Sequence, residues 1–219
     1  MTRHGRLEIE VLVTGPFVEN TIIAADADTG RAVLFDPGDE AERILARVRE
    51  LGVDIERIVC THAHLDHVGA VAPLSRMLGV KFYLHPDEQP LLDNLELSAR
   101  MFGLQPPETP TVDAPLAHGD EVPVGELRGR VRLTPGHSPG GCAIYFADQK
   151  VVIVGDALFA GSIGRTDLPG GNLQQLLDAI REQLLSLDDD TVVYPGHGPA
   201  TTIGEERAHN PFLQPGFGR

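Results

Sequence analysis

The segment that decides the interpretation of this chain reads Thr61-His62-Ala63-His64-Leu65-Asp66-His67. It places imidazoles and a carboxylate within a few residues of one another, and these groups are ligands that suit zinc, iron and similar divalent ions. In an extended His-x-His sequence both side chains project to the same side of the backbone, so His62 and His64 are able to bind one ion. Asp66 and His67 follow a turn and are placed to face a second ion. We therefore favour a metal centre over a solvated polar turn.

Three further ligand-type residues lie beside glycines, directly after short apolar runs that predict strands. They are His137 after strand 131–134, Asp156 after strand 151–154, and His197 after strand 191–194. With the first segment, four separate strands thus end in a ligand-type residue. Such clustering of loops at one edge of a sheet scaffold is typical of functional sites.

Hydrophobic periodicity predicts alternating strands and helices along the chain. The expected helices are 39–51, 68–78 and 173–187, the last with Asn172 as its N-cap. The remaining expected strands are 7–13, 21–25, 32–35, 55–60, 80–84 and 143–146. The stretch 103–125 is rich in Pro and Gly, which predicts a surface connection. No linker or repeat divides the sequence, so we expect one α/β domain over residues 1–219, with two sheets between helical layers.

Composition limits the classes of function. The formal net charge of −14 argues against a nucleic-acid partner and against an anionic membrane surface. No apolar run approaches the roughly 20 residues that cross a bilayer, and the N-terminus has no apolar signal region. These features predict a cytoplasmic protein. In that compartment, Cys60 and Cys142 are expected to be inert buried thiols.

Other polar residues are expected to be structural. His4, His85, His118 and His209 lack partners at ligand spacing, and the run 188–190 of aspartates is typical of a solvated loop. Asp36 precedes Pro37 and Gly38, which indicates a turn. An aspartate there is also suited to brace a metal-binding histidine.

The ligand pattern, THxHxDH followed by His, Asp and His, resembles that of the metallo-β-lactamase superfamily along the whole chain. The resemblance implies an αββα sandwich, with the site at one edge of two mixed sheets flanked by helices. It implies two divalent ions, with zinc favoured and iron or manganese as alternatives. The implied ligands are His62, His64 and His137 for the first ion, Asp66, His67 and His197 for the second, and Asp156 bridging both.

Two segments resemble one branch of this superfamily in particular. Phe159 to Asp167 reads FAGSIGRTD, and the sequence around His197 reads PGHGP. Both are similar to short bacterial glyoxalase II-like hydrolases, which cleave S-acylglutathione thioesters such as S-lactoylglutathione. The resemblance implies a small-molecule thioester substrate, a metal-bound hydroxide as nucleophile, and catalytic roles for Asp66 and Asp156 in orienting it. Arg165 would either shape the site or form an ion pair with Asp167.

One departure from the family pattern makes the assignment of an S-acylglutathione substrate less secure. Long glyoxalase II enzymes carry a C-terminal helical domain that helps to hold glutathione, whereas 22 residues (219 − 197) follow His197 in this chain. The main alternative is a mononuclear iron persulfide dioxygenase of the same superfamily, in which His62, His137 and Asp156 would hold the iron. A non-catalytic metal-binding protein and a β-lactamase proper are disfavoured, the latter by the lack of an export signal. Lactonase activity and the oligomeric state stay open.

Overall fold

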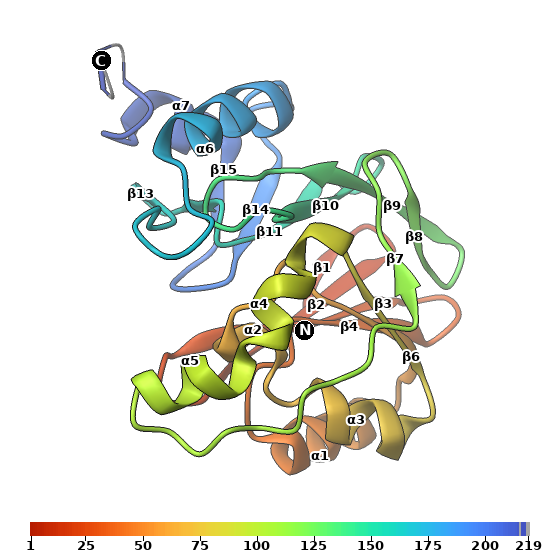
Figure 1. Cartoon of the computed structure of the whole chain (residues 1–219). Coiled ribbons are helices and arrows are strands. Elements are labelled where there is room, and N and C mark those ends of the chain that lie inside the picture. The colour runs from red at the N-terminus through yellow and green to blue at the C-terminus, as the bar shows by residue number, and fades with distance from the viewer. Residues whose placement is uncertain (215, 218–219) are drawn as a thin grey trace.

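Two mixed β-sheets lie face to face, and helices cover their outer faces (Figure 1). The computed structural model describes residues 1–214, 216 and 217. The order of layers is helices, sheet, sheet, helices, which confirms the predicted αββα sandwich.

The first sheet has seven strands in the order of the chain. They are β1 (Thr2–His4), β2 (Leu7–Thr14), β3 (Glu19–Asp26), β4 (Arg31–Phe35), β5 (Asp54–Val59), β6 (Lys81–Leu84) and β7 (Ala114–Pro115). Strands β1 to β4 pair antiparallel, whereas β4 to β7 pair parallel.

The second sheet has six strands in the order β15-β14-β11-β10-β9-β8. Its strands are β8 (Glu121–Val124), β9 (Leu127–Leu133), β10 (Cys142–Phe146), β11 (Val151–Gly155), β14 (Val192–Pro195) and β15 (Thr201–Thr202). Only β11 and β14 pair in parallel among these strands. A separate small hairpin joins β12 (Leu158–Phe159) to β13 (Ser162–Ile163).

Helices α1 and α3 cover the first sheet, and α6 and α7 cover the second. The α-helices are α1 (Ala41–Leu51), α2 (Leu65–Val68), α3 (Val71–Leu78), α4 (Gln89–Asp93), α5 (Leu95–Met101), α6 (Leu173–Ala179) and α7 (Ile203–His209). A 3-10 turn, η1 (Pro86–Glu88), precedes α4, and a π-helical segment, η2 (Ile180–Leu184), continues α6. Asn172 caps α6 as predicted, because its side-chain oxygen accepts the N–H of Gln175.

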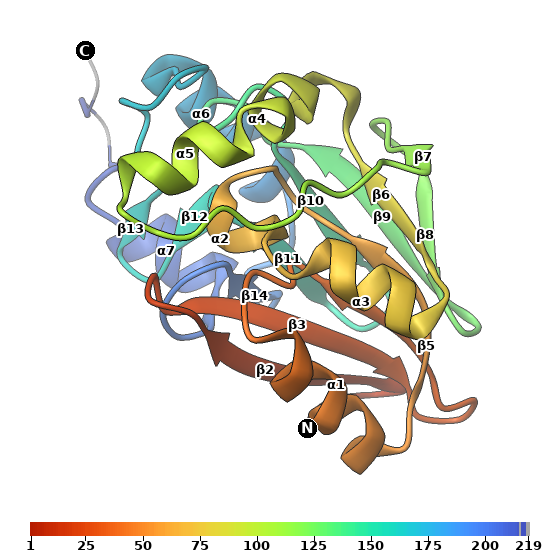
Figure 2. The same cartoon turned by 60° about the horizontal axis from the view of Figure 1, so that its bottom comes forward.

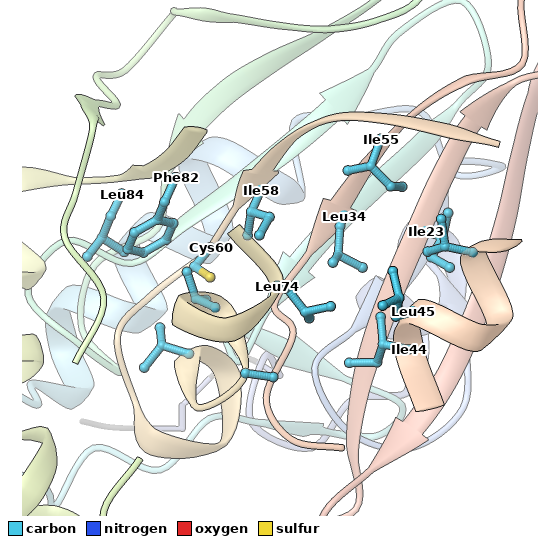
Figure 3. Packing of buried hydrophobic residues seen from close by; sticks show 14 of the residues in the cluster. Ile23, Leu34, Ile44, Leu45, Ile55, Ile58, Cys60, Leu74, Phe82 and Leu84 are labelled. Atoms are coloured by element: carbon cyan, nitrogen blue, oxygen red, sulfur yellow. The ribbon is translucent and has the colours of Figure 1, made fainter. Parts of the chain in front are cut away.

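Alternation along the central strands divides the apolar residues between two cores. In β4, Val33 and Phe35 point between the sheets, while Leu34 points outward toward α1 and α3. Strands buried on both faces read as continuous apolar runs, which is why the sequence shows them clearly. Figure 3 shows Leu34 and Ile58 of the first sheet packed with Leu74 of α3.

Several sequence predictions need correction. The helix predicted at 68–78 begins later, at Val71, because Val68 ends the short helix α2 and the Ala70 N–H bonds to the oxygen of Pro37 instead of a helical partner. The helix predicted at 173–187 widens into η2 and ends at Leu184, and the Leu185 N–H bonds to the oxygen of Ile180. The connection predicted at 103–125 contains β7 and β8. Pro123 is tolerated in β8 because this strand lies at a sheet edge.

The described helices and the two cysteines agree with what the composition predicts. In the described residues no helix is long and apolar enough to cross a bilayer. Cys60 and Cys142 are buried and unbridged, and burial raises the pKa of both thiols. A raised pKa keeps a thiol in its less reactive protonated form.

Candidate metal centre

The four predicted ligand segments meet at one edge of the sandwich. Strand β5 leads to residues 61–67, β9 to His137, β11 to Asp156 and β14 to His197. Side-chain ligand atoms of His62, His64 and His137 lie within 4.8 Å of one another, and so do those of Asp66, His67 and His197. The fold therefore brings together the residues that sequence reasoning selected.

The first group of three has a fixed geometry. His64 Nδ1 lies 2.8 Å from His137 Nε2. The other nitrogen of His137, Nδ1, donates to the backbone oxygen of Arg165 over 2.7 Å. This bond holds the ring with Nε2 facing the group. His62 Nδ1 lies 3.1 Å from Thr61 Oγ1, which leaves its Nε2 as the free ligand atom.

In the second group, the two histidines lie beside carboxylates. His197 Nε2 lies 3.2 Å from Asp66 Oδ2, and His67 Nε2 lies 4.0 Å from the same oxygen. Asp156 faces both groups: its Oδ1 is 3.4 Å from His67 Nε2, and its Oδ2 is 3.5 Å from both His137 Nε2 and His197 Nε2. Asp156 therefore has the position that a bridging ligand requires.

Unpartnered buried atoms test whether these residues fit metal ions. His62 Nε2, His67 Nε2 and Asp156 Oδ1 are buried and have no hydrogen-bond partner among the described residues. Leaving such an atom unsatisfied costs about 1–3 kcal/mol. All three belong to the converging groups, and imidazole nitrogens and carboxylate oxygens are ordinary ligands of divalent metals. The donor set fits two such ions.

The two groups differ in charge. Burial lowers the pKa of His62, His64 and His137, that of His64 to about 3, so these rings are neutral. In the second group, burial opposes ionisation, but opposite charges outweigh it. The pKa values of Asp66 and Asp156 are lowered, and those of His67 and His197 are raised. A metal ion entering there must displace protons.

Asp36 braces the first ligand segment. It is buried, with its Oδ1 2.6 Å from the Thr61 N–H and its Oδ2 2.6 Å from Thr61 Oγ1 and 3.1 Å from His67 Nδ1. The bond to Nδ1 turns the other nitrogen of His67 toward the second group. Of the two roles considered from the sequence, the geometry supports the brace.

Asn20 was missed by sequence reasoning. From β3 of the first sheet, its side-chain nitrogen donates to the oxygens of Pro195 and Gly198, on either side of His197, over 3.0 and 2.8 Å. Its own N–H bonds to the Gly196 oxygen over 2.7 Å. These contacts hold the His197 loop of the second sheet against the first. The signal was a buried amide within an apolar strand, since such a group needs partners.

The remaining sequence candidates lie outside the centre. Arg165 and Asp167 form a bidentate ion pair with both contacts at 2.7 Å, which supports the second of the roles considered for them. His4 contacts Tyr194, His85 caps η1, His118 accepts the Leu133 N–H, and His209 is exposed beside Glu205.

A cleft of about 270 Å³ opens beside Asp66. Phe17, Leu65, Leu104 and Pro107 give it an apolar lining, and none of the described residues lining it is Lys, Arg or His. Phe17 packs edge to face on Phe102, which follows α5, with ring centroids 5.1 Å apart. Figure 2 shows α5 beside α2, the short helix that carries Asp66.

The chain matches a known protein family over most of its length. The family model described as the metallo-beta-lactamase superfamily matches residues 14–197, which span all seven ligand-type residues. The chain belongs to the metallo-β-lactamase superfamily.

Within the superfamily, the relatives include hydrolases of the predicted branch. The chain is 37% identical over 214 residues to the hydroxyacylglutathione hydrolase GloC of Haemophilus influenzae, with 94% of this chain and 98% of that protein covered. This relation supports the glyoxalase II-like branch.

Two solved structures with a closely similar fold are described differently, one by its enzyme class and the other by its bound metal. One is BLEG-1, a B3 metallo-beta-lactamase, with a TM-score of 0.88, 38% identity, and coverage of 94% of this chain and 100% of that one. The other is TTHA1623 in a di-iron-bound form, with a TM-score of 0.86, 44% identity, and coverage of 93% and 100%. The superfamily members similar to this chain thus include both a β-lactamase and a protein that holds two irons.

Proposed function

We propose that this protein is a dinuclear metal-dependent hydrolase of thioesters, with S-acylglutathione compounds such as S-lactoylglutathione as substrates. The observation that carries the proposal is the position of Asp156 between two complete groups of ligand-type residues. The similarity to GloC supports the thioester class.

His62, His64 and His137 would hold the first ion, Asp66, His67 and His197 would hold the second, and Asp156 would be shared. When bound, such ions lower the pKa of water toward about 7 and polarise a carbonyl group. Zinc is the favoured metal, and the di-iron form of a similar protein makes iron the main alternative.

The protein's own residues supply orientation. Asp66 and Asp156 would offer carboxylate oxygens that accept hydrogen bonds from a nucleophilic water and so orient it. Two divalent ions carry four positive charges against the two carboxylates. The centre is then cationic and attracts an anionic substrate despite the net charge of −14.

The cleft beside Asp66 suits the uncharged part of the substrate. Its apolar side chains would bury hydrocarbon, and none of the described residues lining it is a cation that would pair with a carboxylate. The acyl group therefore lies in this cleft, and the carboxylates of glutathione lie outside it.

The test uses purified protein loaded with zinc, manganese or iron. Hydrolysis of S-lactoylglutathione is measured beside oxygen uptake with glutathione persulfide, and a chromogenic cephalosporin serves as a β-lactam control. Thioester hydrolysis well above the other two rates is the expected result. Oxygen uptake on the persulfide without thioester cleavage would establish the dioxygenase alternative instead.

A further inference from the structure

Glu88 is a buried carboxylate that lies outside both ligand groups. It ends the turn η1, directly after β6, and is fully buried. Its Oε2 accepts the N–H of Ala63 over 2.7 Å, and its Oε1 accepts the N–H of Gly140 over 2.6 Å. Burying a carboxylate is costly unless it is well hydrogen-bonded, so both bonds are needed for this residue to be tolerated.

The partners of Glu88 are the backbones of two ligand loops. Ala63 lies between His62 and His64, in the loop that follows β5 of the first sheet. Gly140 lies three residues beyond His137, in the loop between β9 and β10 of the second sheet. The first group of ligands comes from these two loops alone. One side chain therefore joins both loops that the first group needs.

The loop at Gly140 packs closely against the side chains of His85 and Glu88. A Cβ added at this position would lie 2.6 Å from His85 Nδ1 and 3.1 Å from Glu88 Cγ. A larger residue would push the loop off the carboxylate. The distance between the two loops thus depends on Glu88 and on the absence of a side chain at Gly140.

A second buried carboxylate provides a comparison. Glu206, on α7, accepts bonds from the Gly161 N–H, Thr201 Oγ1 and the Asn210 side chain. None of these partners lies within two residues of a proposed ligand. Glu206 therefore has a structural role that separates general loss of stability from a specific effect on the centre.

We propose that Glu88 is a positioning residue that sets the spacing of His62 and His64 relative to His137 and so determines the affinity of the first metal position. This inference rests on the proposed first ion, and it deepens the assignment by adding a residue that hydrogen-bonds to the backbones of the ligand loops.

The test measures stepwise binding of Co²⁺ to the wild-type chain and to Glu88→Gln, by competition with a chromophoric chelator. An amide has one acceptor oxygen, so either the Ala63 or the Gly140 N–H would face an NH₂ group and lose its acceptor. Loss of such a supporting contact typically weakens metal binding about 10–100-fold. We expect that loss of affinity at the first metal position and a changed d–d absorption of the Co²⁺ bound there. The affinity of the second metal position is expected to stay within about threefold of wild type.

Glu206→Gln is the matched control. It is expected to lower the melting temperature of the apo protein while leaving both Co²⁺ affinities near the wild-type values. Wild-type affinity for the first ion in folded Glu88→Gln would overturn the proposal. So would an equal weakening of both ions in Glu88→Gln, because a selective effect on the first metal position would then be absent.

Gly140→Ala perturbs the other end of the contact and keeps the carboxylate. It is expected to show the same selective loss of the first ion, and wild-type binding in this variant overturns the proposal even if Glu88→Gln does not fold. These affinities are independent of the substrate. A wild-type chain that binds two Co²⁺ ions but cleaves no thioester would refute the proposed function alone, whereas one that binds no Co²⁺ would refute both.

Discussion

Replacing Asp66 by Ala is expected to remove the second ion and leave the first. Asp66 Oδ2 lies 3.2 Å from His197 Nε2 and faces His67, so the variant loses the anionic member of the second group. The first group contains no atom of Asp66. Metal content is therefore expected to fall from about two ions toward one.

The size of the effect on activity follows from what is lost. A supporting residue of a metal ligand typically contributes 10–100-fold, and a ligand contributes at least as much. Thioester hydrolysis is expected to fall by at least about 100-fold, which corresponds to roughly 2.7 kcal/mol of transition-state stabilisation. His197→Ala is expected to act similarly. Asp156→Ala is expected to have a larger effect, because its carboxylate faces histidines of both groups.

The assay combines elemental analysis with kcat/KM on S-lactoylglutathione. Asp178→Asn is the control, since this carboxylate lies on the outer helix α6 and contacts Gln174 and Arg181. It is expected to stay within about twofold of wild type. The reasoning would be refuted if Asp66→Ala and His197→Ala kept one iron and near-normal oxygen uptake with a persulfide.

Three further outcomes are expected. Falling pH should remove the second ion first. The pKa values of His67 and His197 are raised, whereas that of His64 is lowered to about 3, so protons compete with the second ion at higher pH than with the first. Metal content after equilibration at decreasing pH checks this, and simultaneous loss of both ions contradicts it. Asp36→Asn should weaken the second ion about 10–100-fold in chelator competition, because the bond that orients His67 is altered, and unchanged affinity would rule out the brace. Leu104→Trp should fill part of the cleft and lower kcat/KM for the thioester at unchanged metal content, whereas an unchanged kcat/KM would place the substrate elsewhere.

The ligand residues were predictable because their signals are local. Each follows an apolar strand and lies close to a glycine or another ligand-type residue, so a few residues of sequence are enough to find it. The buried strands were predictable for the same reason, since both faces are covered and the runs are continuous.

The supporting residues were not predictable in this way. The partners of Glu88 lie 25 and 52 residues away, and those of Asn20 lie more than 170 residues away. Pairing of β5 with β6 brings Ala63 to Glu88. The packing of one sheet on the other brings Gly140 to Glu88 and the His197 loop to Asn20. The break between α2 and α3 has a similar origin, because the Ala70 N–H bonds to the oxygen of Pro37, a residue far away in the sequence, instead of a helical partner.

Both ligand groups take residues from both sheets, and this has a consequence for folding stability. Once ions are bound, His67 and His197 are cross-linked across 130 residues (197 − 67) in a chain whose two cysteines are unbridged. Closing so long a loop restricts the unfolded chain, and a ligand at 100 times its Kd adds about 2.7 kcal/mol to the free energy of unfolding. The melting temperature should therefore rise with free metal concentration. Chelation should speed amide hydrogen exchange first where β5 and β11 end, since the metal cross-links between the two halves of the sandwich are removed there.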